Sequence, residues 1–424
     1  MSVLSSPARA GAHAPTGTAP LPGWPLLTLL YGFPVIWAAG ALQFAPSVLA
    51  AFMVVLLLNR RHVVVPGPVW VLAAFLLWAA ASSVMVPDLG TGMGFLLRWA
   101  NLFSALVFTV YYFNARETIG HRSVLRGAVV VWITVVALGH LALVLPDARL
   151  TTPVGLLMPD AATSNELVRN LVFPPLAEVQ QPWGAPEPYV RPAAPFPYTN
   201  GWGSAFVVLT PLVLAHLAST RFTLRSLLLL AGLGASLVPA VATSNRGMFL
   251  GISIAMLYVV ARWLLQGRVL PGVAALVVVS GTAAFLVVNG SVAAILGRQE
   301  YSDSTGGRFS LYRATYEAAL RSPLLGHGAP RMDESTGVSM GTQGYLWTLL
   351  FCFGFVGLGL FVAFLHGTTL LTARVRTSPA LFVHSVPVAA CFFFAYYGID
   401  VVQFIVICLC LAMLLRARAH GERW

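Results

Sequence analysis

Long apolar runs alternate with short polar turns along most of this chain. A helix needs about 20 residues to cross a bilayer, and a window of that length finds about twelve candidate spans. They lie near 25–42, 46–58, 67–86, 93–113 and 127–145, then from Trp202, on either side of residues 243–247, up to Val288, and near 345–365, 380–397 and 399–415. The pattern predicts an all-α polytopic membrane protein.

Two long polar segments interrupt this pattern, at about 146–202 and 289–341. Long segments of this kind are usually functional, and we expect both to be exterior loops that contain short helices. The division of the chain follows from these segments. We expect a disordered cytoplasmic tail over 1–24, a single transmembrane domain over 25–416 and a cytoplasmic tail over 417–424.

Composition excludes several classes of protein. Hydrophobic residues make up 58% of the chain, charged residues only 9%, and the mean hydropathy is +0.80, so a soluble globular protein is excluded. The net charge of +11 does not indicate nucleic-acid binding, because the basic residues are scattered between apolar runs. The four cysteines lie in apolar segments without a CxxC spacing, which favours core packing and predicts no metal site.

All 25 basic residues are arginine. Short cytoplasmic loops are enriched in basic residues, so the clusters around Arg60, Arg116, Arg225 and Arg374 orient the chain with both termini inside. Arg98 falls within the fourth span, and nine arginines are left on the exterior face: Arg149, Arg169, Arg191, Arg246, Arg298, Arg308, Arg313, Arg321 and Arg331. An exterior face rich in arginine favours a large anionic substrate, although pairing with acidic residues of the same loops explains most of these positions.

Arg246 differs from the others because it sits in a very short turn between two spans. Ser244 and Asn245 precede it and Gly247 follows it. The guanidinium then lies beside the first backbone N–H groups of the next helix, and together these groups form an anion site. The alternative is an arginine that anchors the helix end at the membrane interface.

Arg191 opens a proline-rich approach to the sixth span. Three prolines in residues 191–203 keep this stretch extended, and it also carries Tyr198 and Asn200. An arginine, a phenol and an amide on a stiff scaffold suit a sugar and its phosphate. An interfacial belt of aromatic residues is the alternative interpretation.

The second long segment predicts a helix over 308–320. Arg308 and Tyr312 share one face of this helix and are candidate ligands, whereas Arg313 and Glu317 form an i, i+4 pair that favours a structural role. His327 is the one histidine placed clearly in an exterior loop, so it is a candidate general base or an incidental loop residue.

Two further charged residues lie within a span or near its outer end. Arg98 is costly within a span unless it lines the bundle interior or reaches the interface, where it could meet a donor headgroup; an internal pair or snorkelling explains it equally well. Asp400 lies near the outer end of the last span, and the sequence assigns it no role.

Three short stretches, in order, resemble the O-antigen ligase and O-antigen polymerase superfamily. They are Ser-Asn-Arg-Gly within 244–251, Gly-Arg at 307–308, and Ser-Pro-Leu-Leu-Gly-His-Gly at 322–328 followed by 341–347. The resemblance extends over about 25–415 in topology. It implies a glycosyltransferase of the bacterial inner membrane that takes an oligosaccharide from undecaprenyl or a related polyprenyl diphosphate. It also implies transfer to a glycan or glycolipid acceptor on the periplasmic face, without a nucleotide sugar, cofactor or metal ion.

The resemblance also implies roles for individual residues. Arg246 matches the family arginine thought to bind the lipid diphosphate, and Arg191 and Arg308 match arginines of the two exterior loops. At the position where ligases carry a histidine proposed to activate the acceptor, this chain has Gln343. Glutamine can hydrogen-bond a sugar but accepts no proton usefully at neutral pH, so the identity of the general base stays open.

Two other functions compete with glycosyl transfer. A transporter or flippase of lipid-linked glycans is expected to carry charge through its spans and to have paired broken helices. Here the spans carry almost no charge apart from Arg98, and the polar residues concentrate in the exterior segments. This distribution favours chemistry at the membrane surface over transport, and a purely structural scaffold would not need Arg246 in so short a turn.

Overall fold

The computed structural model describes residues 20–181, 187–293, 304–333, 338–342, 344–422 and 424. Within them, nine helical segments are long and apolar enough to cross a membrane. These are α4 (Gly67–Ala81) with the 3-10 turn η1 (Ser82–Met85), α5 (Leu89–Asn114), α6 (His121–Val144), α10 (Thr199–Ser219), α11 (Leu224–Ala235) with α12 (Leu237–Ala242), α13 (Arg246–Leu265), α14 (Val269–Val288), α17 (Tyr345–Leu371) and α19 (Val401–His420). The mostly helical membrane architecture predicted from the sequence is confirmed.

The count of twelve spans is not confirmed. The first expected span, near 25–42, consists of two short helices, α1 (Trp24–Tyr31) and α2 (Phe33–Ala38). Pro34 lies in the first turn of α2 and has no N–H to continue the ladder of α1, so the helix breaks there. Two further apolar helices are shorter than the nine, namely α3 (Ala45–Leu58) and α18 (Ser378–Phe393).

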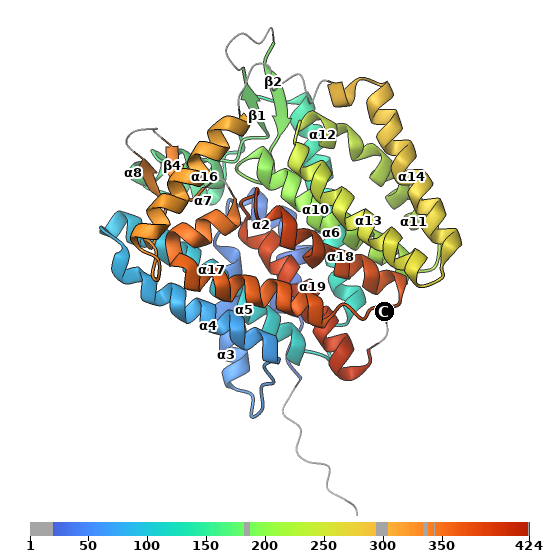
Figure 1. Cartoon of the computed structure of the whole chain (residues 1–424), viewed down its shortest axis with the longest axis horizontal. Coiled ribbons are helices and arrows are strands. Elements are labelled where there is room, and N and C mark those ends of the chain that lie inside the picture. The colour runs from blue at the N-terminus through green and yellow to red at the C-terminus, as the bar shows by residue number, and fades with distance from the viewer. Residues whose placement is uncertain (1–19, 182–186, 294–303, 334–337, 343, 423) are drawn as a thin grey trace, which may run out of the picture.

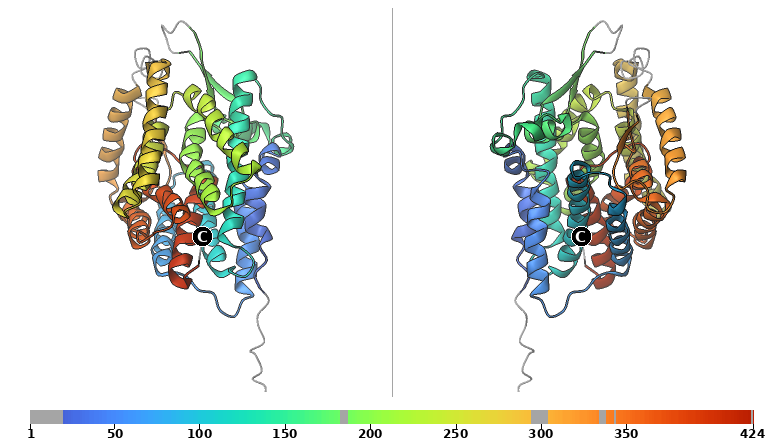
Figure 2. Two further views of the ribbon diagram at one scale, coloured as in Figure 1. Left: turned by 90° about the vertical axis from the view of Figure 1, so that its right-hand side faces the viewer. Right: turned by 90° about the vertical axis from the view of Figure 1, so that its left-hand side faces the viewer.

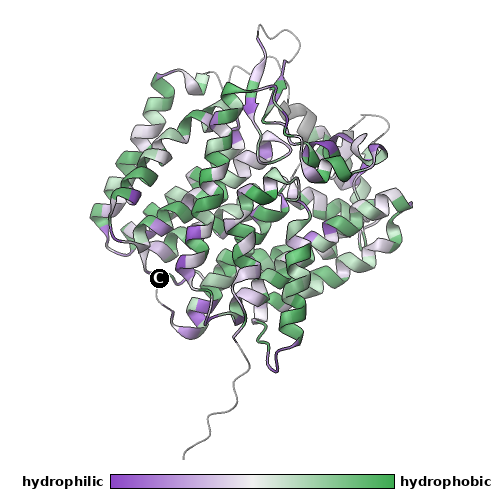
Figure 3. Ribbon diagram, turned by 180° about the vertical axis from the view of Figure 1, so that it is seen from behind, coloured by the Kyte–Doolittle hydropathy of each residue, from purple (hydrophilic) through white to green (hydrophobic). Residues whose placement is uncertain are grey.

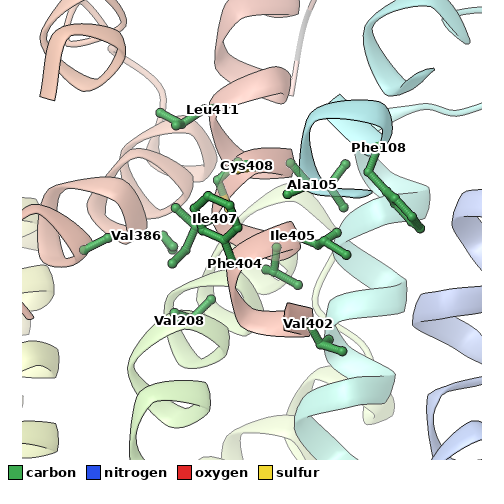
Figure 4. Close-up of a cluster of buried hydrophobic side chains, with 14 of the residues drawn as sticks. Ala105, Phe108, Val208, Val386, Val402, Phe404, Ile405, Ile407, Cys408 and Leu411 are labelled. Atoms are coloured by element: carbon green, nitrogen blue, oxygen red, sulfur yellow. The ribbon is translucent and has the colours of Figure 1, made fainter. Parts of the chain in front are cut away.

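The helix α19 lies at the centre of the bundle. Its most apolar window is 89% buried, against 6% for α14, which lies at the edge and faces outward. The helices α5, α10 and α18 pack around α19, and α10 also packs against α6. Figure 4 shows the result as one apolar cluster in which Ile405, Ile407 and Cys408 lie among Ala105, Phe108, Val208 and Val386. This burial fixes the helices that carry the polar residues described below.

Both long polar segments lie at one end of the bundle, which we call the long-loop end (Figures 1 and 2). Among the described residues, the first contains three short helices and a hairpin, and the second contains one longer helix and another hairpin. Their elements are α7 (Pro153–Leu157), α8 (Asp160–Thr163), α9 (Glu166–Val172), β1 (Ala177–Gln180), β2 (Tyr189–Pro192), α16 (Ser304–Arg321), β3 (Arg331–Asp333) and β4 (Val338–Met340).

Both hairpins are antiparallel, with Glu178 opposite Arg191 in one and Arg331 opposite Met340 in the other. The sequence did not predict them. The helix expected over 308–320 is confirmed as α16, which begins four residues earlier, at Ser304.

Polar residues gather at the two ends of the bundle, and apolar residues cover the helices between them (Figure 3). The opposite end carries the turns around 59–66, 115–120 and 220–223 and the C-terminus. The predicted tail over 1–24 lies mostly outside the described residues, which start at residue 20. At the other terminus, α19 continues as a helix to His420.

Candidate active site at the long-loop end

The turn that joins α12 to α13 is as short as the sequence predicts. The helix α12 ends at Ala242 and α13 begins at Arg246. Ser244 adopts a left-handed backbone with φ of 49°, which is uncommon for a residue with a side chain and tightens the turn. The chain therefore reverses direction within three residues and places Arg246 at the first helical position.

Arg246 is exposed at the N-terminus of α13, a helix of 20 residues. The side chain of Asn245, the residue before it, does not cap the helix. It is engaged elsewhere, since Asn245 donates from Nδ2 to Oδ1 of Asn200 at 3.3 Å and accepts from the hydroxyl of Tyr397. The first N–H groups of α13 thus lie beside an exposed guanidinium, which is a favourable arrangement for an anion.

Arg191, by contrast, is only 8% exposed and contacts protein groups. Its Nε donates to the carbonyl oxygen of Thr243 at 2.8 Å, and its Nη1 donates to Oε1 of Gln180 at 3.3 Å. The same Nη1 lies 3.9 Å from Oε2 of Glu178, which accepts a 2.9 Å hydrogen bond from the backbone N–H of Thr199. Arg191 therefore ties the β1–β2 hairpin to the turn that carries Arg246.

A cavity of about 390 Å³ lies at the long-loop end, and no residue of the turn 243–247 lines it. Two residues predicted to bind substrate, Tyr198 and Asn200, line it. Because Asn200 also accepts the hydrogen bond from Asn245, the wall of the cavity is joined to the Arg246 turn by this one contact. The polar lining residues come from distant parts of the chain and are Gln43, Arg98, Asn101, Tyr198, Asn200, Thr342, Tyr345, Thr348 and Asp400.

The cavity also brings together two charges to which the sequence gave no firm role. Arg98 lies on α5 and Asp400 immediately precedes α19. Of the two positions weighed for Arg98, the structure places it among the residues that line this cavity, and the residue is exposed. Arg98 and Asp400 can both be found from the sequence, because each is a charged residue inside a span or at its end. A charge in such a position costs free energy, so it indicates a function.

Asp400 is the single carboxylate among the residues that line this cavity. Desolvation raises its pKa to about 6, although a 3.3 Å hydrogen bond from Nε2 of Gln403 opposes the shift. The same amide donates to the carbonyl oxygen of Gly201 at 3.0 Å. A carboxyl group with this pKa is largely ionised at neutral pH and can still accept a proton.

Gly201 allows Asp400 to approach α10 closely. A Cβ at this position would lie 2.6 Å from Oδ2 of Asp400 and 2.7 Å from the Cβ of Phe196. Only glycine fits such a contact, so the position of the carboxylate depends on a residue without a side chain.

Four of the predicted site residues, Arg191, Arg246, Tyr312 and His327, are not among the residues that line the cavity. His327 lies 3.0 Å, through Nε2, from the carbonyl oxygen of Ala318, and its ring centre lies 4.6 Å from that of Phe351. It is absent from the cavity lining. Tyr312 stacks on Trp347 with ring centres 4.4 Å apart. The roles predicted for these two residues stay predictions.

Two predicted residues lie outside the part of the chain whose side chains are described. Gln343 is one of them, although its neighbour Thr342 lines the cavity. Arg308 is the other; its backbone belongs to α16. The structural pair predicted on the same helix is confirmed, since Nε of Arg313 donates to Oε1 of Glu317 at 2.8 Å.

The comparison with protein families bears on the turn and on the second long segment. Residues 231–362 match the O-antigen ligase family. The match begins within α11 and ends within α17, so it includes the Arg246 turn, α16 and His327. It confirms the resemblance drawn from the short motifs, and the family implies glycosyltransferase activity of the O-antigen ligase or polymerase type. A comparison with curated proteins finds no match.

Arg191, Tyr198, Arg98 and Asp400 lie outside the stretch that matches the O-antigen ligase family. These residues lie near the matched stretch in the folded structure and not in the sequence. The cavity is lined by Gly341, Thr342 and Tyr345 from within the match and by Arg98, Tyr198 and Asp400 from outside it.

Proposed function

We propose that the protein transfers a glycan from a polyprenyl-diphosphate donor to a hydroxyl group of an acceptor sugar at the exterior face of the bacterial inner membrane. The observation that carries this proposal is the hydrogen bond from Asn245 to Asn200, which links the Arg246 turn of the O-antigen ligase match to the wall of the cavity lined by Arg98 and Asp400. The positive-inside rule supports the exterior placement, because the long-loop end lies opposite the arginine-rich short loops.

In this proposal, the donor diphosphate lies at the N-terminus of α13. Arg246 and the first N–H groups of α13 bind its oxygens, and Arg98 reaches the same group from the cavity. Negative charge grows on the diphosphate as its bond to the anomeric carbon breaks. Permanently charged guanidiniums stabilise that charge in a site from which water is partly excluded.

Asp400 acts as the general base in the same scheme. The acceptor oxygen attacks the anomeric carbon and loses its proton to Asp400, while the electron pair of the broken bond leaves with the polyprenyl diphosphate. His327, the candidate general base of the sequence, is less suitable as the proton acceptor, because its Nε2 faces the carbonyl oxygen of Ala318, and Gln343 has no useful basicity.

Tyr198, Asn200 and Thr342 provide hydrogen-bonding groups for the sugar hydroxyls on the remaining cavity wall. Ligase and polymerase share this donor chemistry and differ in the acceptor. Deleting the gene and analysing the envelope polysaccharide separates them, because lost chain length indicates a polymerase and lost attachment of complete chains indicates a ligase.

The function is tested with purified protein in liposomes that contain a polyprenyl-diphosphate oligosaccharide and an acceptor glycan, without nucleotide sugar. We expect a new glycosidic bond and release of polyprenyl diphosphate, both detected by mass spectrometry. Movement of the donor between leaflets without a new bond would contradict the proposal and favour a flippase. Arg313→Ala is the matched control for Arg246→Ala, because Arg313 is exposed and pairs only within its own helix in the described contacts.

A further inference from the structure

A second cavity, of about 700 Å³, lies at the opposite end of the bundle. It is open to one side and is lined by the start of α6, the end of α10 and the start of α11. Tyr198 and Asn200, at the start of α10, line the proposed active site, whereas His216 and Thr220, at its end, line this second cavity, so the two cavities lie toward opposite ends of α10. Its lining residues are Arg126, His216, Thr220, Arg221, Thr223, Leu224, Arg225, Ser226 and Leu229.

The lining carries three arginines and no carboxylate. Among the described contacts, Arg126, Arg221 and Arg225 make no hydrogen bond or ion pair with a protein group. Other arginines at this end do pair with acidic residues, as Arg116 and Arg416 do with Glu422. Three guanidiniums that converge on one cavity without a protein counter-ion form a site for an external anion.

A buried polar atom in the wall of this cavity also supports binding of an external group. Nδ1 of His216, in the last turn of α10, is shielded from solvent and has no hydrogen-bond partner among the described residues. Buried polar atoms without a partner are rare, because each costs free energy that a bound group can recover. The N-terminus of α11, which begins at Leu224, adds its positive end to the same wall.

The surroundings of the cavity identify the kind of anion. Phe222, Leu224 and Leu228 next to it are 74%, 72% and 64% exposed, and Leu229 lines the cavity itself. The segment of α11 and α12 is only 22% buried, so this apolar surface faces the bilayer. A phospholipid would place its phosphate beside the arginines and its two acyl chains along the apolar surface of α11. A free phosphate would occupy the arginines but leave that apolar surface uncovered.

We propose that this cavity binds the headgroup of an anionic glycerophospholipid from the membrane leaflet at this end of the protein, which the positive-inside rule makes the cytoplasmic leaflet. The bound lipid holds α11 against α6 and α10. Since α11 continues through α12 to residues 243–247, lipid binding also steadies the segment that ends in the Arg246 turn.

The test uses the full chain purified in a neutral detergent and titrated with phosphatidylglycerol, phosphatidylcholine or inorganic phosphate. Thermal unfolding and lipid retention in native mass spectrometry are the readouts. We expect phosphatidylglycerol to raise the unfolding temperature and to be retained, phosphatidylcholine to do neither, and phosphate to have little effect at the same concentration. An equal response to phosphate would overturn the lipid assignment.

Two triple variants distinguish binding at the cavity arginines from a general effect of positive charge at this end of the protein. Arg126→Gln, Arg221→Gln and Arg225→Gln together are expected to weaken phosphatidylglycerol binding more than tenfold. The control combines Arg61→Gln, Arg374→Gln and Arg376→Gln, which removes the same charge from exposed positions at the same end that do not line the cavity. Equal loss in the two variants, or no loss in the first, would refute the proposal. If the first triple does not fold, the single variant Arg225→Gln, at an exposed position, takes its place.

Discussion

The side-chain amide of Asn245 donates a 3.3 Å hydrogen bond to Oδ1 of Asn200, and this contact joins the turn that carries Arg246 to the wall of the polar cavity. The two residues are 45 positions apart in the chain. Asn245 is buried and also accepts from the hydroxyl of Tyr397, so the turn is anchored from two sides. The anion site and the cavity are therefore held in a fixed relation, as a transfer reaction requires.

Arg246→Ala is expected to abolish most of the transferase activity while the protein still folds. Its side chain is exposed, so its removal leaves no cavity in the core. Loss of one group that stabilises developing charge typically lowers kcat by about a hundredfold to a thousandfold. Product formation in liposomes measures the effect, and Arg313→Ala should retain activity close to that of the natural chain. Polymer made normally by the Arg246→Ala protein would rule out the assigned role.

Arg191→Ala is expected to lower stability as well as activity. The substitution leaves the carbonyl oxygen of Thr243 without its 2.8 Å donor and removes the cation near Glu178. A buried acceptor left unsatisfied costs about 1–3 kcal/mol. Thermal unfolding in detergent measures this cost. An Arg191→Ala protein as stable as the natural chain but inactive would favour direct contact with the diphosphate instead.

Asp400→Asn is expected to eliminate activity without lowering stability at pH 7. The pKa of Asp400 in the folded protein, about 6, lies above its ordinary value of 3.8, so the folded state holds the proton more tightly than the unfolded chain. Stability therefore falls as pH rises from about 4 to 6, and a neutral amide avoids this loss. For the natural chain, kcat/KM should drop about tenfold per pH unit below 6 as the base becomes protonated. A profile that is flat between pH 5 and 7 would exclude Asp400 as the base.

Gly201→Ala tests the position of the same carboxylate. The added methyl group would lie 2.6 Å from Oδ2 of Asp400, so the carboxylate or α10 must shift. We expect activity to fall at least tenfold, because small displacements of a catalytic group are costly. Gly234→Ala is the control, since a Cβ there meets no atom within 4 Å. If both variants are fully active, the catalytic role of the carboxylate is wrong.

Local patterns predicted the helices and the Arg246 turn well, because apolar length and a sharp polar interruption are properties of neighbouring residues. The break between α1 and α2 could also be predicted from Pro34, because proline has no N–H to continue the hydrogen bonds of a helix. The cavity was not available from the sequence. Arg98, Tyr198 and Asp400 meet only because α5, α10 and α19 pack together, and that packing depends on contacts between residues hundreds of positions apart.

Arg191 illustrates the same limit for a single residue. Its sequence context marks it as a candidate ligand, whereas the register of the β1–β2 hairpin places it opposite Glu178 and in contact with Thr243. No local pattern indicates that its guanidinium is buried. Predicting its contacts requires the position of a turn that lies 52 residues further along the chain.

A last prediction concerns the C-terminal segment at the opposite end of the bundle. Arg416 is 1% exposed; its Nε donates to Oε2 of Glu422 at 2.9 Å, and its other nitrogens donate to the carbonyl oxygens of Tyr112 and Ile119. Glu422→Ala removes the carboxylate from a buried cation, so we expect a loss of about 3 kcal/mol in the free energy of unfolding.

Glu117→Ala is the matched control, because Glu117 is 67% exposed and lies 3.9 Å from Arg60. An exposed pair of this kind contributes about 0–1 kcal/mol, so this variant should unfold close to the natural temperature. Thermal unfolding of both variants in the same detergent makes the comparison. Equal unfolding temperatures for the two variants would mean that the hydrogen bonds from Arg416 to the two carbonyl oxygens are sufficient to hold the buried guanidinium. The C-terminal residues would then contribute little to the stability of α19.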